Sequence, residues 1–396
     1  MTTVKISEPI KPDGYRQHIY CECGNHLDLI FGDFEQWIGF VSVKIIGLPT
    51  LHCDKCGKDF LPDRSRGFIS YLLDESKEKK TINVSAKRKK LQTKYDLTSV
   101  PFIYDPDDYE YIPGLSRPWD SGFLTPVFFN KHVLLKYDAS PDYRVHFAST
   151  TYGQIIREDG FYISFGINKN DKVVMWLGDI AQLPEPEQYY LRSENVTSDH
   201  SIGSEFYDGQ IEVKFTDLTA KDTLFKLRSD FLESVFEKTG KKIAHLDDEV
   251  LNLVSTFNPP VIDTGKERRH IADTLNKIYI ESFDNKALGA ILVNMGGDPK
   301  ELGTIKRLQM LIERFSSKNE AFSLMSPFYI LYDLRVAYSH LSSGEREVQI
   351  LKTVTDRLNI PEEASLLEIY DEITAGLSSS FDKMRNHIKN SSPSPS

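Results

Sequence analysis

Long hydrophobic runs are missing from this 396-residue sequence, and cysteine is scarce, with only four residues. A membrane-spanning helix needs about 20 consecutive apolar residues, and no segment of the chain approaches that length. The opening residues, MTTVKISEPIKPDG, also lack the apolar stretch of a secretory signal peptide. We therefore expect a cytoplasmic protein without membrane contact. In a reducing compartment, closely spaced cysteines indicate metal ligands before they indicate disulfides.

The cysteines fall into two close pairs, Cys21 with Cys23 and Cys53 with Cys56. A β-rich stretch separates the pairs, and a glycine follows each pair directly. The arrangement resembles the two knuckles of a zinc ribbon, in which four thiolates give Zn²⁺ a closed tetrahedral shell. The first pair departs from that pattern, because one residue separates its cysteines where two are usual. His26 and His52 are therefore competing ligands. A closed shell predicts a structural rather than a catalytic zinc ion.

The formal net charge of −10 is unevenly distributed along the chain. Residues 95–218 contain 9 basic and 20 acidic side chains, so this region should repel nucleic acid. Residues 74–94 contain 8 basic and 3 acidic side chains. Such a basic segment is typical of a solvated linker or a surface helix. The alternative is an arm that contacts phosphates through the Lys-Arg-Lys-Lys run at residues 87–90.

Strand patterns dominate residues 95–218, in the segments YRVHFAST, GFYISFGI, KVVMWLG and GQIEVKF. In the last segment, Glu212 and Lys214 would share one face of a strand, with Asp199 and Asp208 upstream. That pattern resembles the acid and acid-x-lysine arrangement of restriction-type nucleases, which use Mg²⁺. Alternating charge on an exposed strand produces the same pattern, and it is the simpler interpretation.

From about residue 219 onward, the apolar residues recur with the period of α-helices. Residues 219–264 are expected to form connecting helices. Beyond them, four or five helices with short connections over residues 265–390 predict an antiparallel bundle.

The segment SPFYILYDLRVAYSHLSSG, residues 326–344, predicts a helix that is apolar on nearly every face and therefore buried in the bundle. Ser326 would cap this helix and Pro327 would occupy its first turn. The helix nevertheless carries Arg335 and His340. A buried guanidinium is costly unless it is paired, so one interpretation is an ion pair with Asp333 or with a carboxylate of another helix.

Arg335 and His340 form an Arg-x4-His pair near the end of an apolar helix in an all-α region. This pair resembles the signature of the HEPN superfamily of ribonucleases, found in toxin–antitoxin and abortive-infection antiphage proteins. The resemblance covers about residues 265–390. It implies an endoribonuclease of antiviral defence, with two copies facing each other across a dimer. Val336 stands where the family often has Asn, Asp or His, and three nearby residues could take that polar role: Ser339, Tyr338 and Asp333.

The implied chemistry needs no metal ion, because RNA carries its own nucleophile, the 2′-hydroxyl group. His340 would act as general base or acid, since imidazole titrates near neutral pH. Arg335 would hold the scissile phosphate and stabilise the charge of the transition state. The expected partners are an RNA substrate, a second copy of the chain bound through the C-terminal bundle, and a protein that triggers or regulates cleavage.

The expected fold class is multidomain α+β, with a small zinc ribbon, a β-rich middle domain and a C-terminal antiparallel α-helical bundle. An alternative function is a non-catalytic protein whose ribbon and basic segment bind nucleic acid or a partner protein, while the bundle only dimerises. The expected division of the chain is a ribbon-like domain at 1–73, a basic linker or surface helix at 74–94, an acidic β-rich domain at 95–218, connecting helices at 219–264, the HEPN-like bundle at 265–390 and a disordered tail at 391–396.

Overall fold

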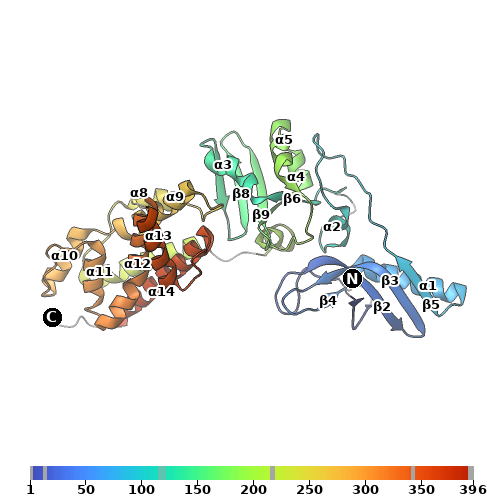
Figure 1. Cartoon of the computed structure of the whole chain (residues 1–396), viewed down its shortest axis with the longest axis horizontal. Helices are drawn as coiled ribbons and strands as arrows, with labels where there is room; N and C mark the ends of the chain where they lie inside the picture. Colours follow the sequence, from blue (N-terminus) through green and yellow to red (C-terminus); the bar gives the residue numbers. More distant parts are fainter. Residues whose placement is uncertain are drawn as a thin grey trace. The chain divides into compact units, whose positions relative to one another are not determined.

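The chain forms two compact units, Met1–Asp217 and Leu218–Ser396, in a computed structural model. The first unit contains two β-sheets and the second is helical, which confirms the expected mixed class with C-terminal helices (Figure 1). Among the described residues, no helix is both long enough and apolar enough to cross a bilayer. The expected tail at 391–396 lies outside these residues. The structure describes residues 3–11, 16–115, 117, 119, 121–214, 219–339 and 344–390.

The first sheet has five strands and is built around a long hairpin. β2 (Asp28–Ile38) and β3 (Val41–His52) pair antiparallel, and Gly39 allows the turn between them with a φ of +61°. β1 (Thr3–Val4) adds parallel to β2, and β4 (Asp59–Phe60) adds antiparallel to β3. β4 therefore lies beside the last residues of β3, Leu51 and His52.

The basic segment 74–94 is built into this sheet instead of forming a free linker. Its first residues end helix α1 (Asp63–Lys79), and its middle forms β5 (Asn83–Lys87), which pairs parallel with β3. Val84 and Ala86 pack against the core of the sheet, whereas Lys87 is exposed. Apolar residues at alternate positions give β5 one face that packs against the core of the sheet. This face explains why the segment forms a strand and not a linker, despite its charge.

Arg88 does not fit the alternative interpretation either, in which residues 87–90 contact phosphates. Its guanidinium lies 3.6 Å from the centre of the Phe31 ring and forms an ion pair with Asp107, whose side chain is fully buried. Lys90 pairs with Asp105, at 2.8 Å between Nζ and Oδ2. Two of the four basic residues are therefore committed to carboxylates within the protein.

The second sheet has six antiparallel strands in the order β11-β6-β10-β9-β8-β7. Three of the predicted strands, YRVHFAST, GFYISFGI and KVVMWLG, are confirmed as β7, β9 and β10. The fourth prediction is wrong, because Asp208–Glu212 form a π-helical turn. The strands are β6 (Pro126–Asn130), β7 (Tyr143–Phe147), β8 (Tyr152–Arg157), β9 (Tyr162–Ile167), β10 (Lys172–Trp176) and β11 (Asn195–Val196).

Short helices flank the second sheet. They are α2 (Pro106–Tyr111), α3 (Leu135–Ala139), α4 (Leu177–Ala181), α5 (Glu185–Glu194) and α6 (Glu205–Tyr207). In α2, the buried carboxylate of Asp108 accepts hydrogen bonds from His200 Nδ1 at 2.6 Å and from Ser198 Oγ at 2.6 Å. Burial alone lowers the pKa of His200, but the bond to Asp108 and the charge of Asp108 raise it overall. This contact fixes the loop after β11 against α2.

The two sheets share one hydrophobic core, although the sequence suggested separate ribbon and β-rich domains. Leu29 and Leu51 of the first sheet pack in the same cluster as Phe128 and Trp176 of the second. Cys21 and Cys53 are buried members of this cluster as well. Since burial of shared apolar surface favours one cooperative body, residues 1–73 and 95–217 belong to a single unit.

The second unit is a set of helices around one large core. The expected connecting helices of 219–264 belong to this core, because Phe231 packs against Phe381, with ring centres 5.6 Å apart. A π-helical turn, Lys277–Glu281, continues α9. The helices are α7 (Ala220–Thr239), α8 (Asp247–Thr256), α9 (Gly265–Asn276), α10 (Asn285–Asn294), α11 (Thr304–Ile312), α12 (Lys318–Ser339), α13 (Gly344–Leu358) and α14 (Leu366–Asn390).

Helix α12 begins at Lys318, so the expected start at Ser326 and Pro327 is wrong. The Ser317 hydroxyl accepts a hydrogen bond from the Glu320 N–H at 3.2 Å and acts as the cap. Pro327 lies inside the helix, where its ring packs closely against Gly376 of α14. A Cβ atom at position 376 would lie 3.1 Å from the proline Cγ, so the glycine makes room for the ring.

Candidate functional site

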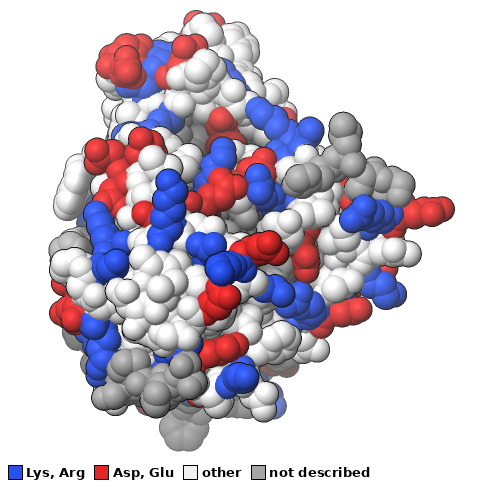
Figure 2. Space-filling view, turned by 90° about the vertical axis from the view of Figure 1, so that its left-hand side faces the viewer, with Lys and Arg blue, Asp and Glu red and all other residues white. Residues whose placement is uncertain are grey.

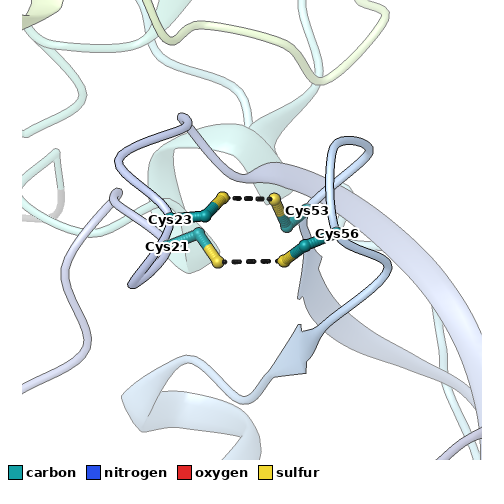
Figure 3. Close-up of side chains that lie close together, drawn as sticks. All are labelled: Cys21, Cys23, Cys53 and Cys56. Carbon is teal, nitrogen blue, oxygen red and sulfur yellow. Dashed lines mark hydrogen bonds between the residues drawn. The ribbon is translucent and has the colours of Figure 1, made fainter.

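The four cysteines form a compact cluster of sulfur atoms. Their Sγ atoms all lie within 4.8 Å of one another, with 3.4 Å between Cys21 and Cys56 and 3.6 Å between Cys23 and Cys53. Figure 3 shows that the two pairs come from two facing loops and point toward each other. In a tetrahedral shell with metal–sulfur bonds of about 2.3 Å, the sulfurs are about 3.8 Å apart. The cluster therefore fits one metal ion.

Each loop is held by two backbone hydrogen bonds, and these bonds are at equivalent positions in the two loops. The Cys21 carbonyl accepts from the Gly24 N–H at 2.9 Å, and the Cys53 carbonyl accepts from the Gly57 N–H at 2.8 Å. In each loop the N–H of that cysteine donates to the residue after the glycine. Both glycines have a positive φ, +82° and +70°, which glycine adopts without strain. The first loop thus keeps the geometry of the second despite being one residue shorter.

The two competing histidines are engaged elsewhere. His26 Nε2 lies 3.0 Å from Asp208 Oδ1, and His52 Nδ1 lies 2.8 Å from Asp59 Oδ1. Within the described residues, the group of side chains that could hold a metal ion consists of the cysteines alone. The expectation from cysteine spacing is confirmed to that extent, because all four thiols converge on one point.

The environments of the thiols differ. Cys21 and Cys53 are buried, whereas Cys23 and Cys56 are exposed. Burial raises the pKa of the Cys21 thiol to about 12. Burial also raises the pKa of Cys53, but N–H and S–H groups of Cys56 outweigh that effect and lower it to about 7. Of the two buried thiols, Cys53 is therefore the one that forms a thiolate more readily.

Arg335 occupies a second candidate site, in the last turns of α12. Its side chain is 32% exposed, so it is not the fully buried guanidinium that the apolar sequence suggested. The Nε atom lies 3.4 Å from Asp273 Oδ1, and Nη1 lies 3.2 Å from Glu281 Oε1. Two carboxylates from α9 and the turn after it therefore fix the plane of the guanidinium.

The other residues expected near Arg335 have separate roles. Ser339 Oγ donates to Asp273 Oδ1 at 2.8 Å and so joins the Arg335 cluster. Asp333 pairs with Arg357 Nη1 at 3.1 Å, whereas Arg335 pairs with Asp273 and Glu281. His340 lies outside the described residues. Sequence reasoning missed Asp273 and Glu281, because only the packing of α9 against α12 brings them to the arginine.

The rival Mg²⁺ site is not assembled. Lys214 Nζ lies 3.3 Å from the centre of the Tyr20 ring, and Asp208 accepts hydrogen bonds from Tyr20 and His26. Asp199 accepts a hydrogen bond from Asn168 at 3.1 Å. In the part of the chain that the structure describes, these carboxylates do not form a group that could hold a metal ion. The strand that would have aligned Glu212 with Lys214 is a π-helical turn.

Comparisons of the chain with protein-family models, with curated proteins and with solved structures find no match.

Replacing Cys53 with serine should destabilise the whole first unit, because Cys53 is both a cluster thiol and a member of the shared core. A loss of about 3 kcal/mol would lower the Tm of a domain of this size by about 6–12 °C. Calorimetry measures this shift. Lys55→Ala is the matched control, since this exposed side chain lies in the same loop and should leave the Tm unchanged. Equal Tm values for Cys53→Ser and the unmodified protein would contradict the assignment.

Proposed function

We propose that the chain is a metal-independent endoribonuclease that cuts RNA with Arg335 and His340, and that it serves in antiviral defence. The observation that carries the proposal is the position of Arg335, which is about one-third exposed near the end of α12 and held in orientation by Asp273 and Glu281. Among the described residues, its Nη2 atom donates no hydrogen bond. The N–H groups of Nη2 therefore remain for a phosphate oxygen.

The proposed reaction begins with the 2′-hydroxyl group of RNA, which attacks the adjacent phosphorus. His340 removes the proton of that hydroxyl or protonates the leaving 5′-oxygen. Arg335 donates N–H groups to the phosphate and stabilises the negative charge that accumulates on it in the transition state. The products are a 2′,3′-cyclic phosphate and a 5′-hydroxyl end. DNA, which lacks the 2′-hydroxyl group, should not be cut.

A two-fold dimer of the second unit completes the proposal. Phe322 and Tyr332 on α12 are 62% and 47% exposed, and Val348 on α13 is 59% exposed. Exposed apolar side chains on neighbouring helices favour burial against a partner surface. On the face that Figure 2 shows, the coloured basic and acidic side chains are interspersed between broad uncharged areas. Such a surface suits a second copy of the chain better than it suits a long RNA backbone.

We also propose that the cysteine cluster binds one structural Zn²⁺ ion. Four thiolates form a closed shell with no open position for substrate or water, which is typical of structural zinc. Elemental analysis of the untagged protein should give about one zinc ion per chain. Iron in place of zinc, or no metal at all, would contradict this identification.

A non-catalytic function is the second candidate, in which the first unit binds nucleic acid or protein and the bundle only dimerises. The observation that favours it is the pairing of Arg335 with two carboxylates, because their charges exceed that of the guanidinium. A phosphate approaching Arg335 would then meet net negative charge. Substitutions at Arg335 distinguish the two candidates.

His340→Ala should reduce RNA cleavage by at least about 100-fold, because general acid–base catalysis contributes that much or more. Arg335→Lys should also abolish cleavage, since an ammonium group on a flexible stem cannot keep the orientation that Asp273 and Glu281 give the planar guanidinium. Cleavage of a labelled RNA, measured in EDTA, tests both variants. Arg357→Lys is the matched control, because Arg357 is also ion-paired with a carboxylate in this unit but lies away from the cluster.

The unmodified protein and Arg357→Lys should cut RNA at similar rates in EDTA and leave cyclic phosphate ends. Cleavage that disappears in EDTA while His340→Ala cuts normally would refute the proposed mechanism. No cleavage by any form of the protein, together with a stable dimer, would favour the non-catalytic candidate.

A further inference from the structure

Two adjoining hollows on the first unit have no role in the site described above. The larger, about 570 Å³, lies at the start of α1 and the end of α2, and the smaller, about 340 Å³, lies between α1, β3 and the residues after β5. Arg64 and Tyr111 line both hollows, so these two side chains form the boundary between them. The two hollows therefore adjoin at Arg64 and Tyr111.

Basic side chains are concentrated along these adjoining hollows, which we name the basic groove. Arg64 forms an ion pair with Glu110, but its own side chain remains 56% exposed. The other exposed cations make no ion pair with any carboxylate of the described residues, and Asp63 and Glu110 are the two acidic residues of the lining. The exposed cations of the basic groove are Arg16, Arg64, Lys87, Lys89 and Arg117.

This concentration contrasts with the acidity of the whole chain, whose net charge is −10. The N-terminus of α1 adds to it. Helix α1 is 17 residues long, its N-cap residue, Pro62, makes no side-chain cap, and Pro62 and Asp63 line the larger hollow. Free N–H groups and the helix dipole attract anions. The groove is therefore suited to a chain of phosphates.

Exposed aromatic rings lie beside these cations. Trp119, in the larger hollow, is 78% exposed. Phe68, in the smaller hollow, is 38% exposed and stacks on Tyr71 of the next helical turn, with ring centres 6.5 Å apart and an interplanar angle of 14°. Aromatic rings that face solvent in this way do not stabilise the fold. Stacking on a planar ligand would remove them from water.

We propose that the basic groove binds single-stranded nucleic acid, with phosphates on its cations and bases stacked on Trp119, Tyr111 and Phe68. Cations and aromatic rings that line the same groove match a backbone that carries both phosphates and unstacked bases. A duplex hides the faces of its bases and would leave the rings unused. This inference does not depend on the proposed cleavage by the second unit, because binding and cutting involve different residues.

Binding is measured with probes that the proposed cleavage cannot cut. These are a fluorescent oligothymidylate of about 12 nucleotides and its 2′-O-methyl RNA equivalent, with a duplex of the same length as comparison. Fluorescence anisotropy with the full chain, over a range of salt concentrations, gives the affinity and its salt dependence. The two single-stranded probes show whether the groove distinguishes ribose from deoxyribose.

Lys87→Ala combined with Lys89→Ala should weaken binding of the single strands and reduce the slope of log K against log salt by about 1.4, since each lost phosphate contact removes about 0.7. Trp119→Ala should weaken binding by about fivefold or more with an unchanged slope, because stacking is not ionic. Lys226→Ala combined with Lys300→Ala is the control, since it removes two exposed charges from the second unit.

The expected result is a loss of affinity in both groove variants and none in the control. Three results would overturn the inference: no binding of either single strand by the unmodified protein, equal losses in the control and in Lys87→Ala/Lys89→Ala, or a duplex bound as tightly as the single strands. None of these results depends on whether the protein cuts RNA, so the two proposals fail separately.

Discussion

The burial of the cysteine loops in a core that both sheets share is the constraint on which the first unit depends. Cys21 and Cys53 are packed with Leu29 of the first sheet and with Phe128 and Trp176 of the second. A metal ion bound there would cross-link the loops at the point where the sheets meet. The ion then stabilises more than a small ribbon, because the second sheet loses part of its core if the loops separate.

This shared core also positions the surfaces that we connect with function. Tyr109 of α2 packs in this core, and the end of α2 and the start of α1 line the basic groove around Arg64 and Tyr111. The same packing places Arg88 over Phe31 and against Asp107, which leaves Lys87 and Lys89 as the outward members of the basic run. In the second unit, the equivalent constraint is the ion pairing of Arg335 with two carboxylates.

The sequence was sufficient for features that depend on local spacing. Cysteine pairs followed by glycine predicted the cluster, and β-branched runs predicted three strands of the second sheet. A local signal for the true start of α12 was overlooked, because Ser317 and Glu320 have the spacing of a helix cap. The helix begins at this cap and continues through Pro327. The partners of Arg335 could not be predicted, because Asp273 is 62 residues away in sequence and reaches it only through helix packing. GQIEVKF alternates like a strand, but its residues 209–212 belong to a π-helical turn, whose first residue, Asp208, is held by Tyr20 and His26.

Hydrogen–deuterium exchange measured before and after removal of the metal with a chelator tests the shared core most directly. The account predicts that amides of β6 and β10 lose protection together with those of β2 and β3, because all four strands contribute to the core around the cysteine loops. Helices of the second unit should keep their protection. Loss of protection confined to β2 and β3 would contradict the account, since the cysteine loops would then stabilise only the first sheet.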